Sequence, residues 1–227
     1  RATMPRTLDE RVVIVDIDER SLEEVGHWPW GRDKLAQLTQ ELLERQQAAV
    51  LGFDVVFSEP DGSSGLRHLQ HLAQGALRDV PGYGQALQKL APKLDFDQRF
   101  AEVLRGQSVV LGYYFTSDRD GGARGQLPQP VVIRQQLMGQ ALRATAWNGH
   151  GSNIPSLAQA APVAGFFNAM SDVDGVVRSL PLLAQYQGQY YESLALAVFR
   201  TLLGLPEVRP SFAAGGTQEW AAVQGIE

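Results

Sequence analysis

The chain has 227 residues, of which 44% are hydrophobic and 20% are charged, and its formal net charge is −5. This composition is typical of a globular protein and excludes a disordered or fibrous chain. The mild acidity, without a cluster of Lys and Arg, argues against nucleic acid as a partner. The absence of cysteine excludes disulfides, thiolate metal sites and a cysteine nucleophile.

The first part of the chain predicts a strand, a helix and a second strand. Residues 11–18 (RVVIVDID) form an apolar run that ends in charge, which is typical of a buried parallel strand. Leucines repeat at helical spacing from Asp33 onward, and residues 48–57 (AAVLGFDVVF) indicate the second strand. We therefore expect a parallel βαβ unit here.

The middle of the chain adds an insertion, a helix and a third strand. Residues 62–93 are rich in Gly and Gln and have helical character around LRHLQHLAQGAL. Residues 96–106 predict an amphipathic helix, and residues 108–115 predict the third strand. Residues 117–130 have the composition of a surface loop.

The last third predicts an antiparallel hairpin and a helix. From Gly165 the sequence indicates a strand, a loop, a strand, a turn at Gln187-Gly188, a strand and a helix. Residues 206–227 are expected to add an edge hairpin. The fold class we predict is α/β, with a single domain over residues 1–227 and two or three layers around a mixed sheet.

Acidic residues follow several of the predicted strands, at Asp16 and Asp18, at Asp54, Glu59 and Asp61, and at Asp172 and Asp174. In an open α/β sheet, ligands bind beyond the carboxyl ends of the parallel strands, so acids from adjacent strands can converge there. Asp16, Asp18, Asp54 and Asp174 are therefore the candidate ligands of a divalent cation, the one cofactor that the sequence suggests.

Two sharper interpretations of these acids have little support. Asp16 and Asp18 have the spacing of an aspartyl nucleophile and its general acid in haloacid-dehalogenase-like phosphotransferases, but Glu19-Arg20-Ser21 is the wrong continuation. A calcium loop around Asp174-Gly175 would need ligands where Met170 and Pro181 stand. A tight turn at Asp174-Gly175 is favoured instead.

The segment GHWPWGR (26–32) places Trp28 and Trp30 on either side of a proline and ends in Arg32. We interpret the two tryptophans as an aromatic plug. Arg32 has the chemistry to pair with an acid or to clamp an anion. No nucleophile elbow, P-loop or dinucleotide fingerprint occurs, so no catalytic residue is predicted.

Taken in order, the motifs D-I-D…W-P-W-x-R, F-D-x-x-F-x-E-P-D and D-x-D-G-V-x-R resemble the type-two CHASE domain over about residues 10–205. The resemblance implies a periplasmic or extracellular sensory domain of a bacterial membrane receptor, with flanking transmembrane helices in the same chain. It further implies a cytoplasmic output such as a nucleotide cyclase or kinase.

The chain departs from the family pattern in two places. Residues 62–93 are longer than the connection usual after the E-P-D element, and the sequence stops near Ile226, where a membrane helix would be expected. The sequence is therefore expected to be one piece of a longer protein.

The resemblance and the acids together predict a polar, non-catalytic cluster at the strand ends. Its members are Asp16, Asp18, Arg32, Asp54, Glu59, Asp61, Asn168, Asp172, Asp174 and Arg178. Either these groups fix the loops by ion pairs, which is preferred, or they bind a cation or a small polar ligand.

Three functions follow from this interpretation. The chain is expected to be a homodimeric sensor for an unknown small molecule or ion. The alternatives are a divalent-metal-dependent hydrolase or phosphotransferase that uses Asp16 and Asp18, and a dimerisation module without a ligand.

Overall fold

The computed structural model describes residues 9–118, 120–137, 139, 142, 144–169, 174–212 and 223–226. The chain divides after Trp30 into two compact units, one up to Trp30 and one from Gly31 onward. The first unit contains helix α1 (Glu19–Val25), which begins after the N-cap residue Asp18. The second unit contains all the remaining described helices and strands.

The strand predicted at residues 11–18 is wrong. Residues 12–18 form no strand in the structure, and the side chains of Val12 to Val15 are exposed. A run of β-branched residues has the propensity for a strand, but a strand exists only within a hydrogen-bonded ladder. No ladder partner is recorded for residues 12–18, so the predicted βαβ unit lacks its first strand.

A mixed five-stranded sheet organises the second unit. Its strands are β1 (Leu51–Phe53), β2 (Val109–Thr116), β3 (Ala123–Arg124), β5 (Gly149–Gly151) and β6 (Ala164–Phe166). Strand β2 is central: it is parallel to β1 and β6 and antiparallel to β5. The third predicted strand is confirmed as β2, and the second is confirmed as β1 but is shorter than predicted.

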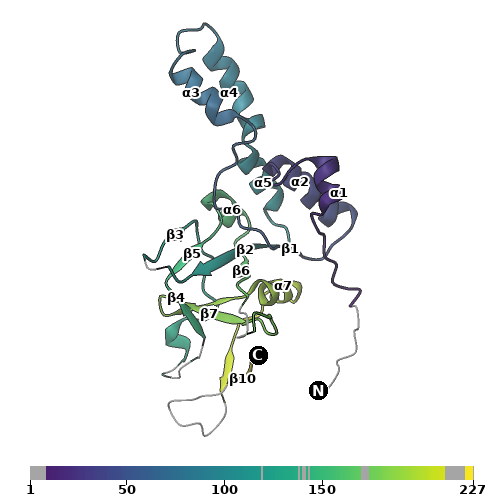
Figure 1. Cartoon of the computed structure of the whole chain (residues 1–227), viewed down its shortest axis with the longest axis vertical. Helices are drawn as coiled ribbons and strands as arrows, with labels where there is room; N and C mark the ends of the chain where they lie inside the picture. The colour runs from purple at the N-terminus through teal and green to yellow at the C-terminus, as the bar shows by residue number, and fades with distance from the viewer. Residues whose placement is uncertain are drawn as a thin grey trace. The chain divides into compact units, whose positions relative to one another are not determined.

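Helices cover both faces of this sheet. They are α2 (Arg32–Gln40) with its π-helical continuation η1 (Glu41–Arg45), α5 (Phe96–Leu104), α6 (Pro155–Ala160) and α7 (Leu194–Leu202). Figure 1 shows α2 and α5 on one side of the sheet and α7 on the other. Phe53 of β1 points toward α5, where its ring centroid lies 5.9 Å from that of Phe100. The preceding residue, Gly52, faces α7 on the opposite side of the sheet: a Cβ added to it would lie 2.8 Å from Val198. The predicted mixed α/β architecture in layers is confirmed.

The predicted C-terminal hairpin and helix are also confirmed. Strands β7 (Leu183–Tyr186) and β8 (Gln189–Glu192) pair antiparallel, and β4 (Thr145–Trp147) joins them in a second sheet. Gln187 and Gly188 connect the pair and both have positive φ, as the right-handed twist of a two-residue hairpin requires. Helix α7 follows, with Ser193 as its N-cap.

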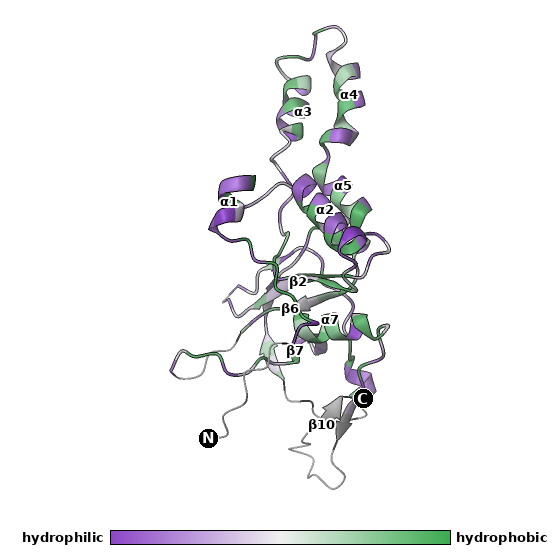
Figure 2. Cartoon of the chain, turned by 90° about the vertical axis from the view of Figure 1, so that its right-hand side faces the viewer, coloured by the Kyte–Doolittle hydropathy of each residue, from purple (hydrophilic) through white to green (hydrophobic). Residues whose placement is uncertain are grey.

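The remaining elements are short or lie apart from the main sheet. They are the 3₁₀ turn η2 (Arg134–Leu137), the antiparallel pair β9 (Pro210–Phe212) and β10 (Val223–Ile226), and the insertion helices α3 (Leu66–Gln74) and α4 (Tyr83–Leu94). Helices α3 and α4 form a hairpin that extends from the α2 and α5 end of the second unit (Figures 1 and 2). The helical character predicted within residues 62–93 is confirmed.

Three phenylalanines fill the space between β1 and α5. Phe53, Phe57 and Phe100 meet edge to face, with centroids 5.6–5.9 Å apart. Phe57 is 1% exposed and Phe100 is fully buried. Edge-to-face aromatic pairs add stabilisation beyond their buried area, so this trio anchors the layer that carries Arg32.

We expect Phe57→Ala to lower the free energy of unfolding by about 3–5 kcal/mol, because it opens a cavity in this layer. Urea unfolding measures the change. Leu182→Ala is the matched control, because Leu182 is 49% exposed and should change stability by no more than about 0.5 kcal/mol. Equal effects of the two substitutions would contradict this account of the core.

Candidate functional site

Arg32, the first residue of α2, is the centre of a nearly buried polar cluster. Its guanidinium Nε lies 3.6 Å from Oδ1 of Asp97, and these two side chains are only 12% and 14% exposed. The planar head stands over the ring of Phe57, with Cζ 4.4 Å from the ring centroid. A cation over an aromatic face is attracted by the ring quadrupole, and more strongly where water is excluded.

Asp61 connects Arg32 to Asp97 through the backbone. The N–H of Arg32 donates to Oδ2 of Asp61 at 2.5 Å, and the N–H of Asp61 donates to Oδ2 of Asp97 at 2.8 Å. A guanidinium nitrogen of Arg32 also donates to the carbonyl oxygen of Glu59 at 3.3 Å. The cluster therefore ties together the start of α2, the E-P-D turn and the start of α5.

This connection closes the base of the helical insertion. Residues 62–94 leave the cluster after Asp61 and return to it just before Asp97, and the Asp61–Asp97 hydrogen bond joins the two ends. Because the entropic cost of a closed loop grows slowly with its length, a long insertion is tolerated once its ends are pinned.

Burial and hydrogen bonding set the pKa values in the cluster. Burial lowers the pKa of Arg32, although Asp97 and Asp61 act against it. Burial also raises the pKa of Asp97, and the N–H of Asp61 and the charge of Arg32 offset only part of that rise. At Asp61 the upward effect of burial is outweighed by hydrogen bonds from Arg32 and Ser63, so its pKa is lowered. Asp61 is thus the better-stabilised anion.

Gly31 lies where the side chains of Asp33 and Ser63 come close to its backbone. A Cβ at this position would lie 2.6 Å from both Oδ1 of Asp33 and Oγ of Ser63. Ser63 in turn donates its N–H to Oδ1 of Asp61 at 2.6 Å. A side chain at this glycine of the W-P-W-G-R motif would therefore displace the ends of Asp33 and Ser63, whereas the backbone of Gly31 is not left-handed.

Two asparagines satisfy backbone groups beside β2, and one of them, Asn153, also binds the backbone of Phe57 in the cluster. Asn153 accepts the N–H of Phe57 at 2.8 Å and donates its amide to the carbonyl of Gly112 at 3.0 Å. Asn168 accepts the N–H of Phe115 at 2.8 Å and donates to the carbonyl of the same residue at 2.9 Å. Both side chains act as substitutes for a neighbouring strand and satisfy buried backbone groups. Asn168 is thus explained as structural.

The sequence placed Arg32, Glu59 and Asp61 in one predicted polar cluster, and the structure has these three residues in contact. The predicted cluster did not include Asp97, Phe57 or Asn153, which also contact it or one another. Asp97 stands in the first turn of a helix that begins right after Asp95, and that position could have been proposed because acids are favoured there. Phe57 and Asn153 are revealed only by contacts between residues distant in sequence.

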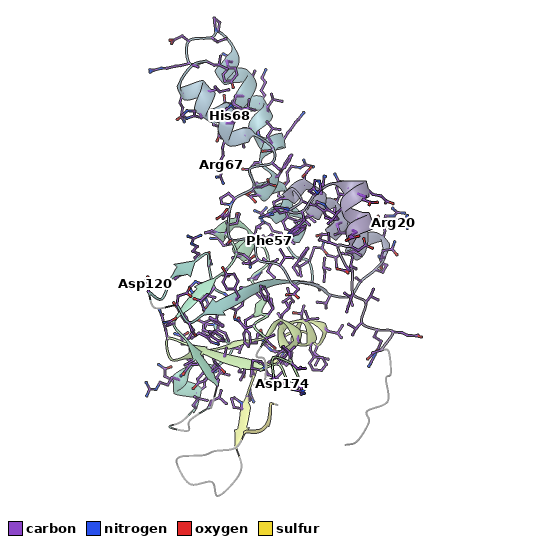
Figure 3. The ribbon with its side chains drawn as sticks, viewed as in Figure 1. Arg20, Phe57, Arg67, His68, Asp120 and Asp174 are labelled. Carbon is purple, nitrogen blue, oxygen red and sulfur yellow. The ribbon has the colours of Figure 1, made fainter. Side chains whose placement is uncertain are left out.

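Other predicted members make local contacts. Asp54 and Glu59 have exposed side chains, and the carboxylate of Glu59 lies 3.9 Å from Arg124. Asp174 pairs with Arg178 at 2.7 Å, with both side chains more than half exposed, and it accepts the N–H of Val176 as a turn residue does. Figure 3 shows Asp174 and Phe57 labelled in different regions of the second unit. Asp172 lies outside the described residues.

In the first unit, Asp18 caps α1 by accepting from the N–H and hydroxyl of Ser21, at 2.8 and 2.6 Å. These bonds lower the pKa of Asp18, the hydroxyl bond most. Asp16 is exposed.

Trp28 and Trp30 meet edge to face, with ring centroids 6.0 Å apart, and the indole N–H of Trp30 donates to the carbonyl of Gly26 at 2.6 Å. The two rings thus pack on each other within this unit.

Among the residues that the structure describes, no three His, Asp or Glu side chains are grouped so that they could hold a metal ion.

A cavity of about 490 Å³ is lined by η2, β7 and β8, with Leu137, Leu142 and Tyr190 beside Arg134 and Gln185. Its size falls in the range of small-molecule pockets, but its surface is mainly polar, whereas most such pockets are mainly apolar.

The second unit thus combines a layered α/β fold with a nearly buried arginine cluster that joins three of its segments. The model of the CHASE2 domain matches residues 1–224. The chain belongs to the CHASE2 domain family, whose members are extracellular sensory domains of receptors. No curated protein and no solved structure matches the chain.

In the described part of the chain, no helix has the length and apolarity that a membrane crossing requires.

We expect Arg32→Leu to lower the free energy of unfolding by about 3–5 kcal/mol, because it leaves Asp97 without its buried cation. Adding Asp97→Asn should recover part of this loss. Denaturant unfolding of both variants measures the coupling. Arg178→Leu is the control, since it breaks an exposed pair with Asp174 and should cost at most about 1 kcal/mol. A loss no larger than the control's would show that the cluster does not hold the fold.

The metal prediction for Asp16, Asp18, Asp54 and Asp174 calls for its own measurement. We expect the melting temperature to be unchanged when Ca²⁺, Mg²⁺ or Zn²⁺ is restored after chelation, because Asp18 caps α1 and Asp174 pairs with Arg178. A bound cation at 100 times its dissociation constant would add about 2.7 kcal/mol. A rise with one cation that Asp16→Asn or Asp174→Asn abolishes would overturn the structural interpretation.

Proposed function

We propose that this chain is the extracytoplasmic signal-sensing domain of a bacterial transmembrane receptor. The observation that carries the proposal is the CHASE2 match across residues 1–224. In this proposal, transmembrane helices of the same protein flank the domain in the periplasm or outside the cell. The signal passes to a cytoplasmic output such as a nucleotide cyclase or a kinase.

The proposed signal is a small molecule or an ion. A ligand shifts a sensor only when it binds one conformation better than another, so it must contact elements that can rearrange. The cavity formed by η2, β7 and β8 supports a small polar molecule, because Arg134 and Gln185 line it together with three residues of a small core cluster, Leu137, Leu142 and Tyr190.

A homodimer is part of the proposal. Helix α7 exposes Phe199 and Leu202, and its C-cap residue Leu203 is exposed beside them; all three are 57–58% accessible. Its one charged residue, Arg200, is turned away to pair with the buried Glu192 at 2.6 Å. An uncharged apolar stripe suits the self-complementary interface of a two-fold dimer, which buries the same surface on both copies.

The two alternatives predict different behaviour. A divalent-dependent hydrolase would need the carboxylate of Asp18, which here caps α1, so no observation favours it. A ligand-free dimerisation module would self-associate without any ligand-linked change in stability.

We expect a cysteine introduced at exposed Asp120 to react with a membrane-impermeant maleimide in intact spheroplasts that express the full-length protein. These 227 residues contain no cysteine, and the full-length protein without the substitution, labelled in parallel, gives the background. Ala101→Cys is the control, because Ala101 is fully buried and should react only after denaturation. Labelling of the Asp120→Cys variant only after lysis would place the domain in the cytoplasm and refute the proposal.

A further inference from the structure

The hairpin of α3 and α4 has an apolar face that its own two helices bury only in part. Leu66, Leu69 and Leu72 share one face of α3, and Tyr83 and Leu87 share one face of α4. These side chains are half-buried, and no residue of either helix is buried. By contrast, the similar helix α5 buries Phe100, Ala101 and Leu104.

The two helices are nevertheless held side by side. The hydroxyl of Tyr83 donates to the carbonyl of Leu69 at 3.1 Å, which links the start of α4 to the middle of α3. Their pairing leaves an open seam, since two helices alone cannot enclose an apolar stripe on all sides. Figure 2 shows hydrophobic and hydrophilic residues alternating along both helices.

The hairpin also differs in charge from the rest of the chain. Residues 62–94 contain Arg67, Arg78, Lys89 and Lys93 but only one acidic residue, Asp79, which gives +3. The whole chain carries −5, so everything outside the hairpin carries −8. A strong charge asymmetry between parts of a chain indicates an interaction with an oppositely charged partner.

The basic and apolar residues meet on α4. Ala86, Leu90 and Lys93 stand at i, i+4 and i+7, so they share one helical face, and Lys89 lies next to Leu90. Leu90 is 47% exposed, and Val80, in the turn before α4, is 46% exposed. The surface therefore offers apolar contact bordered by two ammonium groups.

These features restrict the occupant. A second copy of the hairpin would bring the same positive charge and would be repelled. A nucleic acid or an acidic polysaccharide would use the charges but would leave the leucine seam exposed to water. An amphipathic helix with acidic flanks matches both the apolar seam and the lysines, as in helix-in-groove recognition.

We propose that the α3–α4 hairpin is a docking site for an acidic amphipathic helix of a partner protein. The apolar side of that helix packs on the seam and completes a three-helix bundle. Its carboxylates lie against Lys89 and Lys93. This partner is separate from the ligand that the domain senses.

The test places a photo-crosslinking phenylalanine analogue at Leu90 of the full-length protein in its native cells. We expect a covalent adduct with one other polypeptide, and mass spectrometry should show that the linked peptide is an amphipathic helix with net negative charge. Lys89→Gln with Lys93→Gln should lower the adduct yield about fivefold, since each exposed pair contributes a few tenths to one kcal/mol.

Two controls separate this result from chance capture. The same analogue at Asp120, on the loop before β3, should give no adduct of that mass, and Arg105→Gln should leave the yield at Leu90 unchanged. Figure 3 shows Asp120 and the hairpin residues Arg67 and His68 in separate regions. Unchanged thermal melting of each variant confirms folding. No adduct, an adduct with a lipid or with a second copy, or a yield that ignores the lysines would overturn the proposal.

Discussion

Arg32, whose guanidinium is almost removed from water, lies where three segments of the second unit meet, and backbone hydrogen bonds to two aspartates hold those segments together. Arg32 and Asp61 are 29 positions apart, and Asp61 and Asp97 are 36 positions apart. Their contacts join three segments that would otherwise be independent loops and helix starts. Because each partner also has its own backbone hydrogen bond, the ions need not repay their full desolvation by charge alone. Phe57 contacts both the guanidinium of Arg32 and the rings of Phe53 and Phe100, so it links the polar cluster to the aromatic core.

The sequence predicted the secondary structure best where burial and periodicity agree. Residues 108–115 are apolar almost throughout, and the structure has β2 there with neighbours on both sides. The turn at Gln187-Gly188 was predictable because two-residue hairpins demand residues that accept positive φ. Residues 11–18 have the same apolar signature as β2 but no partner strand. Strand propensity is local, whereas strand pairing is not.

The candidate site was predictable in part for a similar reason. Arg32 and Asp61 belong to motifs that stand out in the sequence, so their pairing could be expected. Asp97 is one acid among several near a helix start, and only the path of the insertion brings it to Asp61. Asn168 was grouped with the acids as a polar residue, but its amide completes a strand edge instead. Composition identifies polar residues, and only the fold decides which of them face a charge.

Asn153 and Asn168, whose amides bond backbone groups of the sheet, make the fold sensitive to a slow chemical change of the side chain. Asparagine slowly loses ammonia to become aspartate, with almost no change in shape. At Asn153 the amide nitrogen donates to the carbonyl of Gly112, so deamidation would place a carboxylate oxygen against that carbonyl. An attraction in the middle of the sheet would become a repulsion between two oxygens that are shielded from water. Asn153 is only 1% exposed, so the tightness of the surrounding core also protects the molecule from this form of ageing.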